Sequence, residues 1–279
     1  MHKQHGDQVV LREVRSDDGQ YLEFDVRGSR AQLHSMLDDT GFVAEALRQS
    51  TIALAHLHYG VPSGWAFLVD RMRFRIQAAS LVDHPPITIR ITSRDVRSRG
   101  THLRSLTSEL QMSSGEKTLA TGEGYLRVVN PPVYQRLRAE HSVRQPSPAA
   151  TRNKHPITLA QHGSRSGTLP THWVASIDPD DPFFFDHEVD HVPGMAIFEA
   201  ACTLATLTSR FATPRIDFFD GRFLEFVELE DLLNLAIEQS PTTTDDRYYV
   251  RVDASTQGRL AMSASIGVSA ACAPQRAEG

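Results

Sequence analysis

The sequence predicts an α+β fold that occurs twice along one chain, each copy consisting of one long apolar helix and an antiparallel sheet. Three observations support this prediction. A strand followed by an apolar helix occurs in both halves of the chain, four alternating runs follow each helix, and a polar, proline-bearing segment separates the halves. No second helix is expected among the runs of either half.

In the first half, apolar and polar residues alternate over 21–28, which is typical of a half-buried strand. Helical spacing follows over 41–60, where apolar side chains leave little of the helix surface polar. Such a helix must be covered, so a sheet that wraps around it is expected. Four alternating runs predict its strands, at 65–76, 86–96, 102–112 and 117–129.

The second half repeats this order, with a strand over 171–177, a loop over 178–192 and a helix over 193–211 whose first turn contains Pro193. One strand, one long helix and four antiparallel strands form the pattern of a hot-dog fold. Two copies in one chain predict a tandem (double) hot-dog that packs as an internal pseudo-dimer. The four later strands of this half are expected at 215–229, 232–240, 246–255 and 259–269.

The segment 131–156 is polar, contains several prolines and is poor in aromatic residues, which is typical of an exposed connection. We therefore expect an N-terminal repeat over 1–135, a linker over 136–156 and a C-terminal repeat over 157–279.

Composition excludes several classes of function. The net charge of −5 over 279 residues lacks the basic stripe of a nucleic-acid-binding protein. Cys202 and Cys272 are far apart and belong to no Cys/His pattern, so no zinc site, other metal site or disulfide is expected. No apolar leader and no run of about 18 apolar residues is present, so a cytoplasmic protein without a membrane span is expected.

Polar residues interrupt both apolar helices. Glu45, Arg48 and Gln49 share one face of the first helix, and burying a carboxylate requires a partner such as Arg48. An ordinary surface pair between residues three apart is the structural alternative. When the helices are aligned, Glu199 of the second helix lies opposite Glu45, so an acid recurs at one position.

The start of the second helix has the features of an acid/base and oxyanion site. Gly194 permits close approach by a substrate, and unpaired N–H groups of the first turn can stabilise charge on its carbonyl oxygen. Glu199 follows five positions later as the candidate general base. His187 and His191 precede the helix and either contact substrate or hydrogen-bond locally within the loop.

The segments FVAEALRQSTIALAHLHYGVPSGWAFL, DHEVDHVPGMAIFEA and DGRFLEFVELED resemble the A-factor synthase (AfsA) family. A more distant likeness is to the β-hydroxyacyl dehydratases. The AfsA resemblance implies transfer of a β-ketoacyl chain from an acyl carrier protein, or a polyketide synthase carrier domain, to a hydroxyl of a three-carbon phosphate or polyol. Dihydroxyacetone phosphate is the expected acceptor, on the way to γ-butyrolactones or butenolides. The chain arrives as a phosphopantetheine thioester, and no other cofactor is implied. The functional acids carried over are Glu45 and Glu199, with Arg48 beside the first.

One residue departs from the family pattern. Where the second helix of the family reads Glu-Ala-Ala-Arg, this chain has Cys202, which cannot supply a fixed positive charge. Cys202 is then either inert packing or a nucleophile. The missing charge could come from Arg222 or from the strand arginines Arg71, Arg73 and Arg75, although solvated strand arginines are the plainer interpretation.

The leading hypothesis is acyl transfer, with Glu199 as base and with Glu45 and Arg48 orienting the acceptor. Two other functions stay open: a hot-dog thioesterase or dehydratase that uses the same glutamate, and a non-catalytic protein that binds an acyl chain or a lactone.

Overall fold

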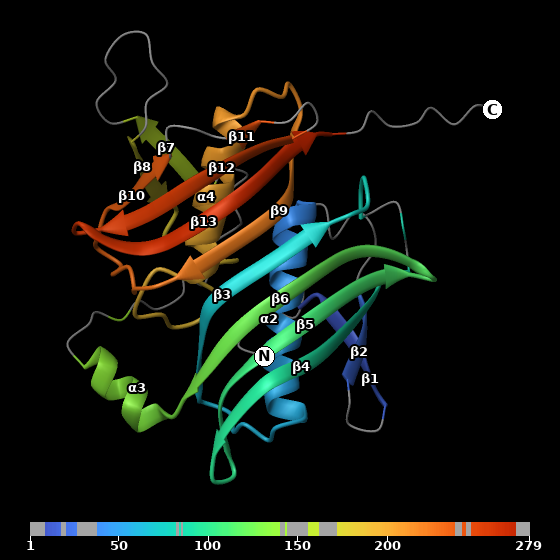
Figure 1. Ribbon diagram of the computed structural model, residues 1–279. Coiled ribbons are helices and arrows are strands. Elements are labelled where there is room, and N and C mark those ends of the chain that lie inside the picture. Colours follow the sequence, from blue (N-terminus) through green and yellow to red (C-terminus); the bar gives the residue numbers. More distant parts are fainter. Residues whose placement is uncertain are drawn as a thin grey trace.

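The computed structural model describes residues 9–17, 21–26, 38–81, 84, 86–139, 143, 156–161, 172–237, 242–243 and 247–271. Its strands form one antiparallel sheet, and the long helices α2 and α4 pack on the same face of that sheet (Figure 1). The predicted tandem hot-dog is therefore confirmed. Cys272 lies outside the described residues.

In the first repeat, α2 spans Asp39–Leu57, close to the predicted helix, and begins at the N-cap residue Asp38. Its strands are β1 (Leu11–Asp17), β2 (Tyr21–Val26), β3 (Ala66–Ile76), β4 (Thr88–Arg99), β5 (His102–Ser114) and β6 (Lys117–Val129). β1 was not predicted; within the described part of the chain it lies at the edge of the sheet and pairs with β2.

In the second repeat, α4 spans Gly194–Thr208. Its strands are β7 (Ile157–Gln161), β8 (His172–Ile177), β9 (Pro214–Phe223), β10 (Leu233–Ile237), β11 (Thr242–Thr243), β12 (Arg247–Thr256) and β13 (Arg259–Ala270). The strand predicted over 215–229 is too long, because β9 ends at Phe223 and the chain leaves the sheet there. The edge strand β7 and the short β11 were not predicted either.

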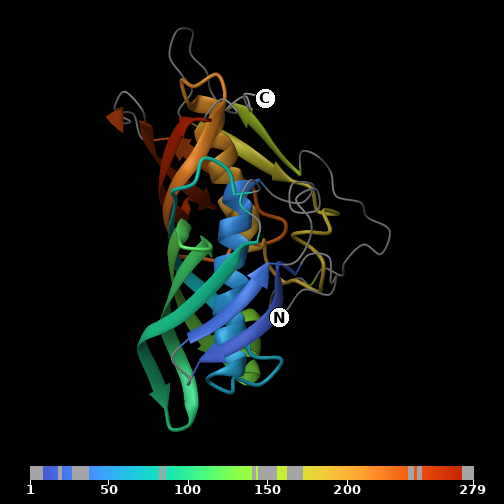
Figure 2. The ribbon, with the colours of Figure 1, turned by 90° about the vertical axis from the view of Figure 1, so that its right-hand side faces the viewer.

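The order of the strands shows an internal two-fold arrangement. From the junction outward, one side reads β3-β6-β5-β4-β2-β1 and the other reads β9-β13-β12-β10-β8-β7. β3 and β9 pair antiparallel at the centre, with Arg71 opposite Arg222 and Arg75 opposite Phe218. This is the predicted pseudo-dimer, and Figure 2 shows both helices lying along one side of the continuous sheet.

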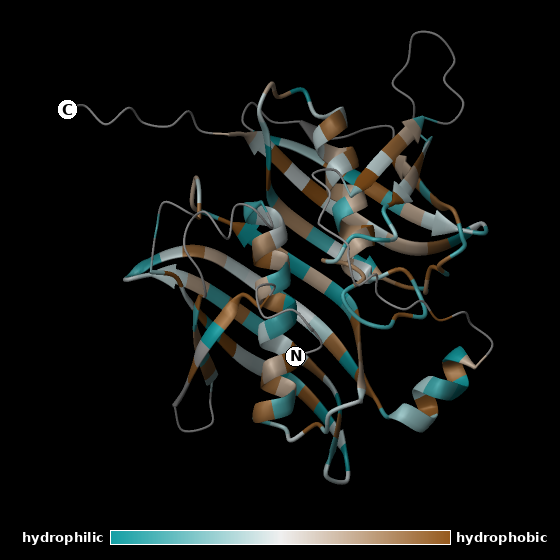
Figure 3. Cartoon of the chain, turned by 180° about the vertical axis from the view of Figure 1, so that it is seen from behind, coloured by the Kyte–Doolittle hydropathy of each residue, from teal (hydrophilic) through white to brown (hydrophobic). Residues whose placement is uncertain are grey.

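The two repeats share one apolar core. At the junction, Phe74 of β3 stacks on Phe219 of β9 with ring centroids 5.7 Å apart, and Phe198 of α4 packs against Phe219 at 4.8 Å. Each of these rings is almost fully buried, and burial of such a side chain stabilises the fold by roughly 1.5–3 kcal/mol. The repeats are therefore expected to unfold together. Seen from behind in Figure 3, α2 and α4 lie across the sheet, and both carry brown (hydrophobic) residues among white and teal ones.

The predicted exposed connection contains a helix, α3 (Pro131–Arg138), which crosses the boundary expected at residue 135. Prolines are compatible with the first turn of a helix, and the side chain of Asn130 caps it by accepting from Val133 N at 3.1 Å. Arg138 at the end of α3 is buried, so the prediction of exposure is wrong there. Most of 140–155 lies outside the described residues.

Among the described residues, no helix combines the length and hydropathy needed to cross a bilayer.

Candidate functional site

A cavity of about 650 Å³ lies between the two repeats. β3 and β9 pair over residues 71–75 and 218–222. Beyond these segments the two strands are no longer paired. Residues 64–70 and 223–227 line the cavity at this opening of the sheet. One face of α2, the beginning of α4 and the loop before α4 complete its walls, so both repeats contribute to it.

The wall formed by α2 carries a buried ion pair. Arg48 donates from Nη2 to Glu45 Oε1 at 2.6 Å and from Nε to Oε2 at 2.9 Å. Gln49 Nε2 also donates to Oε1 at 2.8 Å, while its own Oε1 accepts from Val10 N. The Glu45 side chain is 0% exposed and that of Arg48 is 21% exposed, so the surface-pair alternative is wrong. Burial opposes the charge on Arg48, but the negative charges of Glu45 and Asp186 raise the pKa of its guanidinium.

Two Asp-His pairs lie in the loop before α4. Asp186 Oδ1 is 2.6 Å from His187 Nδ1, and Asp190 Oδ1 is 2.6 Å from His191 Nδ1. Both histidines line the cavity. A carboxylate on Nδ1 selects the tautomer with its proton on that nitrogen, which leaves Nε2 as a proton acceptor. Asp186 is buried and also acts on Arg48, so this pair links the loop to α2.

Helix α4 begins at the cavity without a side-chain cap. Pro193 is its N-cap residue instead of a first-turn residue as predicted, and Gly194, which is exposed, opens the helix. Ala196 and Ile197 donate their N–H groups to Pro193 O, so those of Gly194 and Met195 precede the first helical bond. Both residues line the cavity. These N–H groups are the ones for which an oxyanion-binding role was predicted from the sequence.

The corresponding end of α2 differs. Asp38 Oδ1 accepts from Gly41 N at 2.7 Å, and Thr40, Gly41 and Phe42 are buried. The start of α2 is therefore capped by a side chain and followed by buried residues, whereas α4 starts uncapped at the exposed Gly194. Although the fold has two-fold symmetry, its helix N-termini are unequal, and the uncapped one that lines the cavity belongs to the second repeat.

Glu199 does not line the cavity that contains Gly194. Helix geometry explains this, because five positions at about 100° each place Glu199 roughly 140° around the helix from Gly194. Ile197, three positions on, does line the cavity. The expectation that Glu199 and the Pro-Gly turn face the same substrate thus has no support in the structure.

Cys202 is buried on the Glu199 side of α4 and does not line the cavity either. Burial raises the pKa of its thiol well above the ordinary value, and the negative charges of Asp38 and Glu199 raise it further. The protonated thiol is a poor nucleophile. The structure therefore favours packing over covalent catalysis for Cys202.

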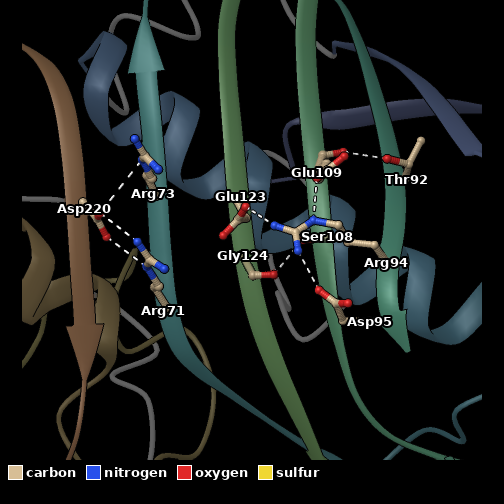
Figure 4. Close-up of polar contacts among 10 residues, drawn as sticks. All are labelled: Arg71, Arg73, Thr92, Arg94, Asp95, Ser108, Glu109, Glu123, Gly124 and Asp220. Carbon is tan, nitrogen blue, oxygen red and sulfur yellow. Dashed lines mark hydrogen bonds and ion pairs between the residues drawn. The ribbon is translucent and has the colours of Figure 1, made fainter. Parts of the chain in front are cut away.

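Arg222 is exposed on β9 and lies outside the cavity. Side chains alternate along a strand, so Phe223 faces the cavity while Arg222 points to the opposite side of the sheet. Figure 4 shows this outer face at the junction, where Arg71 and Arg73 approach Asp220 at 2.9 and 3.9 Å. Arg75 lies over the ring of Phe218. None of these arginines supplies the charge missing at Cys202.

The sequence interpretation missed three residues at this site. Asp186 and Asp190 were quoted only as part of a motif, although the repeated Asp-His dipeptide was a usable signal. Tyr134 of α3 also lines the cavity, and no signal pointed to it because 131–156 was interpreted as a connection. Among the described residues, no group of three or more His, Cys, Asp or Glu is arranged to hold a metal ion.

Comparison with known proteins gives consistent matches. The family profile described as the A-factor biosynthesis hotdog domain matches residues 1–130 and 152–270. The 2-oxo-3-(phosphooxy)propyl 3-oxoalkanoate synthase of Streptomyces virginiae is 27% identical over 82% of this chain and 81% of its own, and that of Streptomyces coelicolor is 26% identical over 82% and 76%.

Solved structures share the fold at low identity. A putative oleoyl thioesterase from Lactobacillus plantarum superposes with a TM-score of 0.55 at 11% identity, covering 92% of this chain and 98% of its own. The tesB protein of Mycobacterium avium subsp. paratuberculosis gives 0.57 at 14%, covering 95% and 98%. These matches confirm the hot-dog architecture.

Proposed function

The chain belongs to the A-factor biosynthesis hotdog (AfsA) family, and from this membership we propose that it is an acyltransferase. It moves a 3-oxoacyl chain from a thioester to a hydroxyl of a three-carbon phosphate, the reaction that the names of its synthase relatives imply. The acceptor oxygen forms a bond to the thioester carbon, the carbon–sulfur bond breaks, and the hydroxyl proton leaves with the thiol.

One observation supports this proposal above the others: a single cavity contains the uncapped start of α4, the Glu45–Arg48 pair and the Asp186–His187 pair. Acyl transfer needs donors for the oxygen of the tetrahedral intermediate and a base for the attacking hydroxyl. The N–H groups of Gly194 and Met195 serve as the donors. His187, held by Asp186, serves as the base.

We assign the base to His187 instead of Glu45 because of the contacts that Glu45 already makes. Both carboxylate oxygens of Glu45 accept hydrogen bonds, from Arg48 and Gln49. The pair is better suited to orient the acceptor. A guanidinium has five N–H donors, and Arg48, with two on Glu45 and partial exposure, keeps others for an anionic group such as a phosphate. Glu199, the base expected from the sequence, lies outside this cavity.

The donor substrate is proposed to be the phosphopantetheine thioester of an acyl carrier protein. The opening between 64–70 and 223–227 offers a route for a long, narrow arm, and its apolar lining, including Trp65 and Phe67, suits the acyl chain. No further cofactor is needed, because the thioester supplies the leaving group and the chain supplies the base and the oxyanion donors.

A product-mass experiment tests this function. The protein is incubated with a β-ketoacyl carrier protein, with and without dihydroxyacetone phosphate, and the products are weighed. Transfer predicts an ester that contains the three-carbon phosphate and appears only when the acceptor is present. A free acid in both reactions would instead identify a thioesterase, and loss of water from a 3-hydroxyacyl thioester would identify a dehydratase. Binding without consumption of the thioester would identify a non-catalytic protein.

A further inference from the structure

Helix α3 connects the two repeats and lies between the segments 1–130 and 152–270 that the family profile matches. It nevertheless reaches the candidate site, because Tyr134 lines the cavity. The side chain of Arg138, at the last turn of this helix, is only 5% exposed. A buried arginine is costly unless it is paired, so its partners indicate its task.

Arg138 binds both loops that form the cavity wall next to α3. Its Nη1 and Nη2 donate to Glu228 Oε1 and Oε2 at 2.9 and 2.6 Å. Its Nε donates to Asp190 Oδ2 at 3.2 Å, and Nη2 also donates to the carbonyl oxygen of Asp190. One guanidinium thus joins the loop before α4 to the loop after β9. The same loops are also joined by Val192 N, which donates to Val227 O at 2.8 Å.

These contacts converge on His191. Asp190 Oδ1 accepts from Tyr134 Oη at 2.9 Å and lies 2.6 Å from His191 Nδ1, so both carboxylate oxygens of Asp190 are held from α3. The ring of Phe226 contacts the guanidinium of Arg138 at 4.6 Å and the imidazole of His191 at 4.7 Å. The position of the imidazole is therefore fixed through Asp190 and Phe226, both of which contact Arg138.

We propose that the connecting helix α3 is part of the candidate active site, and that Arg138 is a positioning residue that orients His191 toward the substrate. Arg138 does not itself line the cavity, whereas His191 and Tyr134 do. Arg138 acts by holding Asp190 against Nδ1 of His191, which turns Nε2 toward the part of the cavity that takes the acceptor. The substrate named in this inference rests on the proposed function, whereas the contacts of Arg138 with Asp190 do not depend on it.

The test compares Arg138→Gln with Arg136→Gln. Arg136 lies on the same helix, is exposed, and donates to Pro132 O within its own turn, so it is the matched control. The nitrogen-bound imidazole protons are recorded by NMR, with His191→Gln used to assign the signal of His191. We expect the protected Nδ1–H signal of His191 in the wild type and in Arg136→Gln, and its loss or displacement in Arg138→Gln.

Kinetics add a second readout. We expect Arg138→Gln to raise the KM for the acceptor about 10- to 100-fold while the KM for the acyl thioester stays unchanged, because misplacement of one contact affects the ligand that uses it. Tyr134→Phe, which removes one of the bonds to Asp190, should have a smaller effect in the same direction. Arg138→Lys should restore only part of the affinity, since an ammonium cannot span both loops as the guanidinium does.

If Arg138→Gln fails to fold because Glu228 loses its contact with Arg138, the charge-balanced variant Arg138→Gln/Glu228→Gln replaces it. An unchanged His191 signal in a folded Arg138 variant would overturn the positioning role. If the wild type shows the signal but transfers no acyl chain, the proposed function fails while the positioning role stands, so the two failures are distinguishable.

Discussion

Nδ1 of His187 lies 2.6 Å from the buried carboxylate of Asp186, and the negative charge of the same carboxylate raises the pKa of Arg48. His187 belongs to the second repeat and Arg48 to the first, so the site depends on contact between the repeats. A base and an anion-binding group in one cavity are a workable arrangement for an acceptor that carries both a hydroxyl and a phosphate.

His187→Gln is expected to lower kcat by about 10²–10⁴ while changing the KM values little, because it removes the proton acceptor without emptying the cavity. Asp186→Asn should also lower kcat, since an amide does not select the required tautomer. Single-turnover kinetics with a carrier-bound thioester measure both effects. Retention of full turnover by His187→Gln would rule out this base.

Glu199→Gln and Cys202→Ala are expected to keep turnover within a factor of about three, because neither residue lines the cavity. Because the pKa of the Cys202 thiol is raised, this thiol should also react slowly with iodoacetamide near pH 8. Labelling is best measured in a Cys272→Ser background, which leaves Cys202 as the remaining cysteine. A large loss of kcat in Glu199→Gln, with the fold intact, would show that the general base is Glu199 of α4.

The sequence was sufficient to predict the fold because the signal was repeated. Two apolar helices, each followed by four alternating runs, allow few arrangements, and the observed sheet agrees with them. The strands β1 and β7, which lie at the two edges of the described sheet, were not predicted. Helix α3 escaped because its prolines were taken as loop signals, although they occupy the first turn.

The site was predicted less completely. Glu45 with Arg48, the two histidines and Gly194 do meet at one cavity. Glu199 was placed with them because sequence alignment of the helices does not show which side of each helix faces the opening between repeats. Arg138 could not be foreseen, because its partners Asp190 and Glu228 are far from it in the sequence and only the folded chain brings them together.

Removal of either partner of the buried pair should have unequal effects on stability. Arg48→Met removes the two hydrogen bonds and the positive charge that Arg48 supplies to the fully buried carboxylate of Glu45, and is expected to lower the free energy of unfolding by about 3 kcal/mol. Glu45→Gln should cost less, about 1–2 kcal/mol, because Arg48 is partly exposed and still interacts with Asp186. Urea unfolding measures both, with Arg251→Met in an exposed pair as the control. Equal losses for Arg48→Met and Arg251→Met would contradict this account.

Gly194 can be changed without harm to the fold. A Cβ there would meet the ring of Phe223 at 3.6 and 3.7 Å, which is ordinary van der Waals contact. Gly194→Ala should therefore unfold like the wild type but hinder the substrate.

Gly194→Pro also removes the N–H, and proline is tolerated here because Gly194 opens the helix after a residue with ψ near 138°. We expect kcat of the proline variant to be about 10²- to 10³-fold lower than that of Gly194→Ala, which is roughly the loss caused by removing one oxyanion-hole donor. Equal kcat in the two variants would show that this N–H does not contact the intermediate.

Asp190 should make stability depend on pH. Burial opposes its ionisation, but hydrogen bonds from His191 and Tyr134 and the charge of Arg138 outweigh this and hold the pKa of the carboxyl below its usual range. Because the folded-state pKa lies below the unfolded value, the stabilisation is complete well above about pH 4 and is lost as the pH falls through and below that value. Asp190→Asn cannot ionise, so its free energy of unfolding should fall less between pH 6 and pH 3.5 than that of the wild type. Urea titrations at several pH values measure the difference, with the more exposed Asp253→Asn as the control. If Asp190→Asn shows the same pH dependence as the wild type, the carboxylate does not stabilise the contact between α3 and the loop before α4.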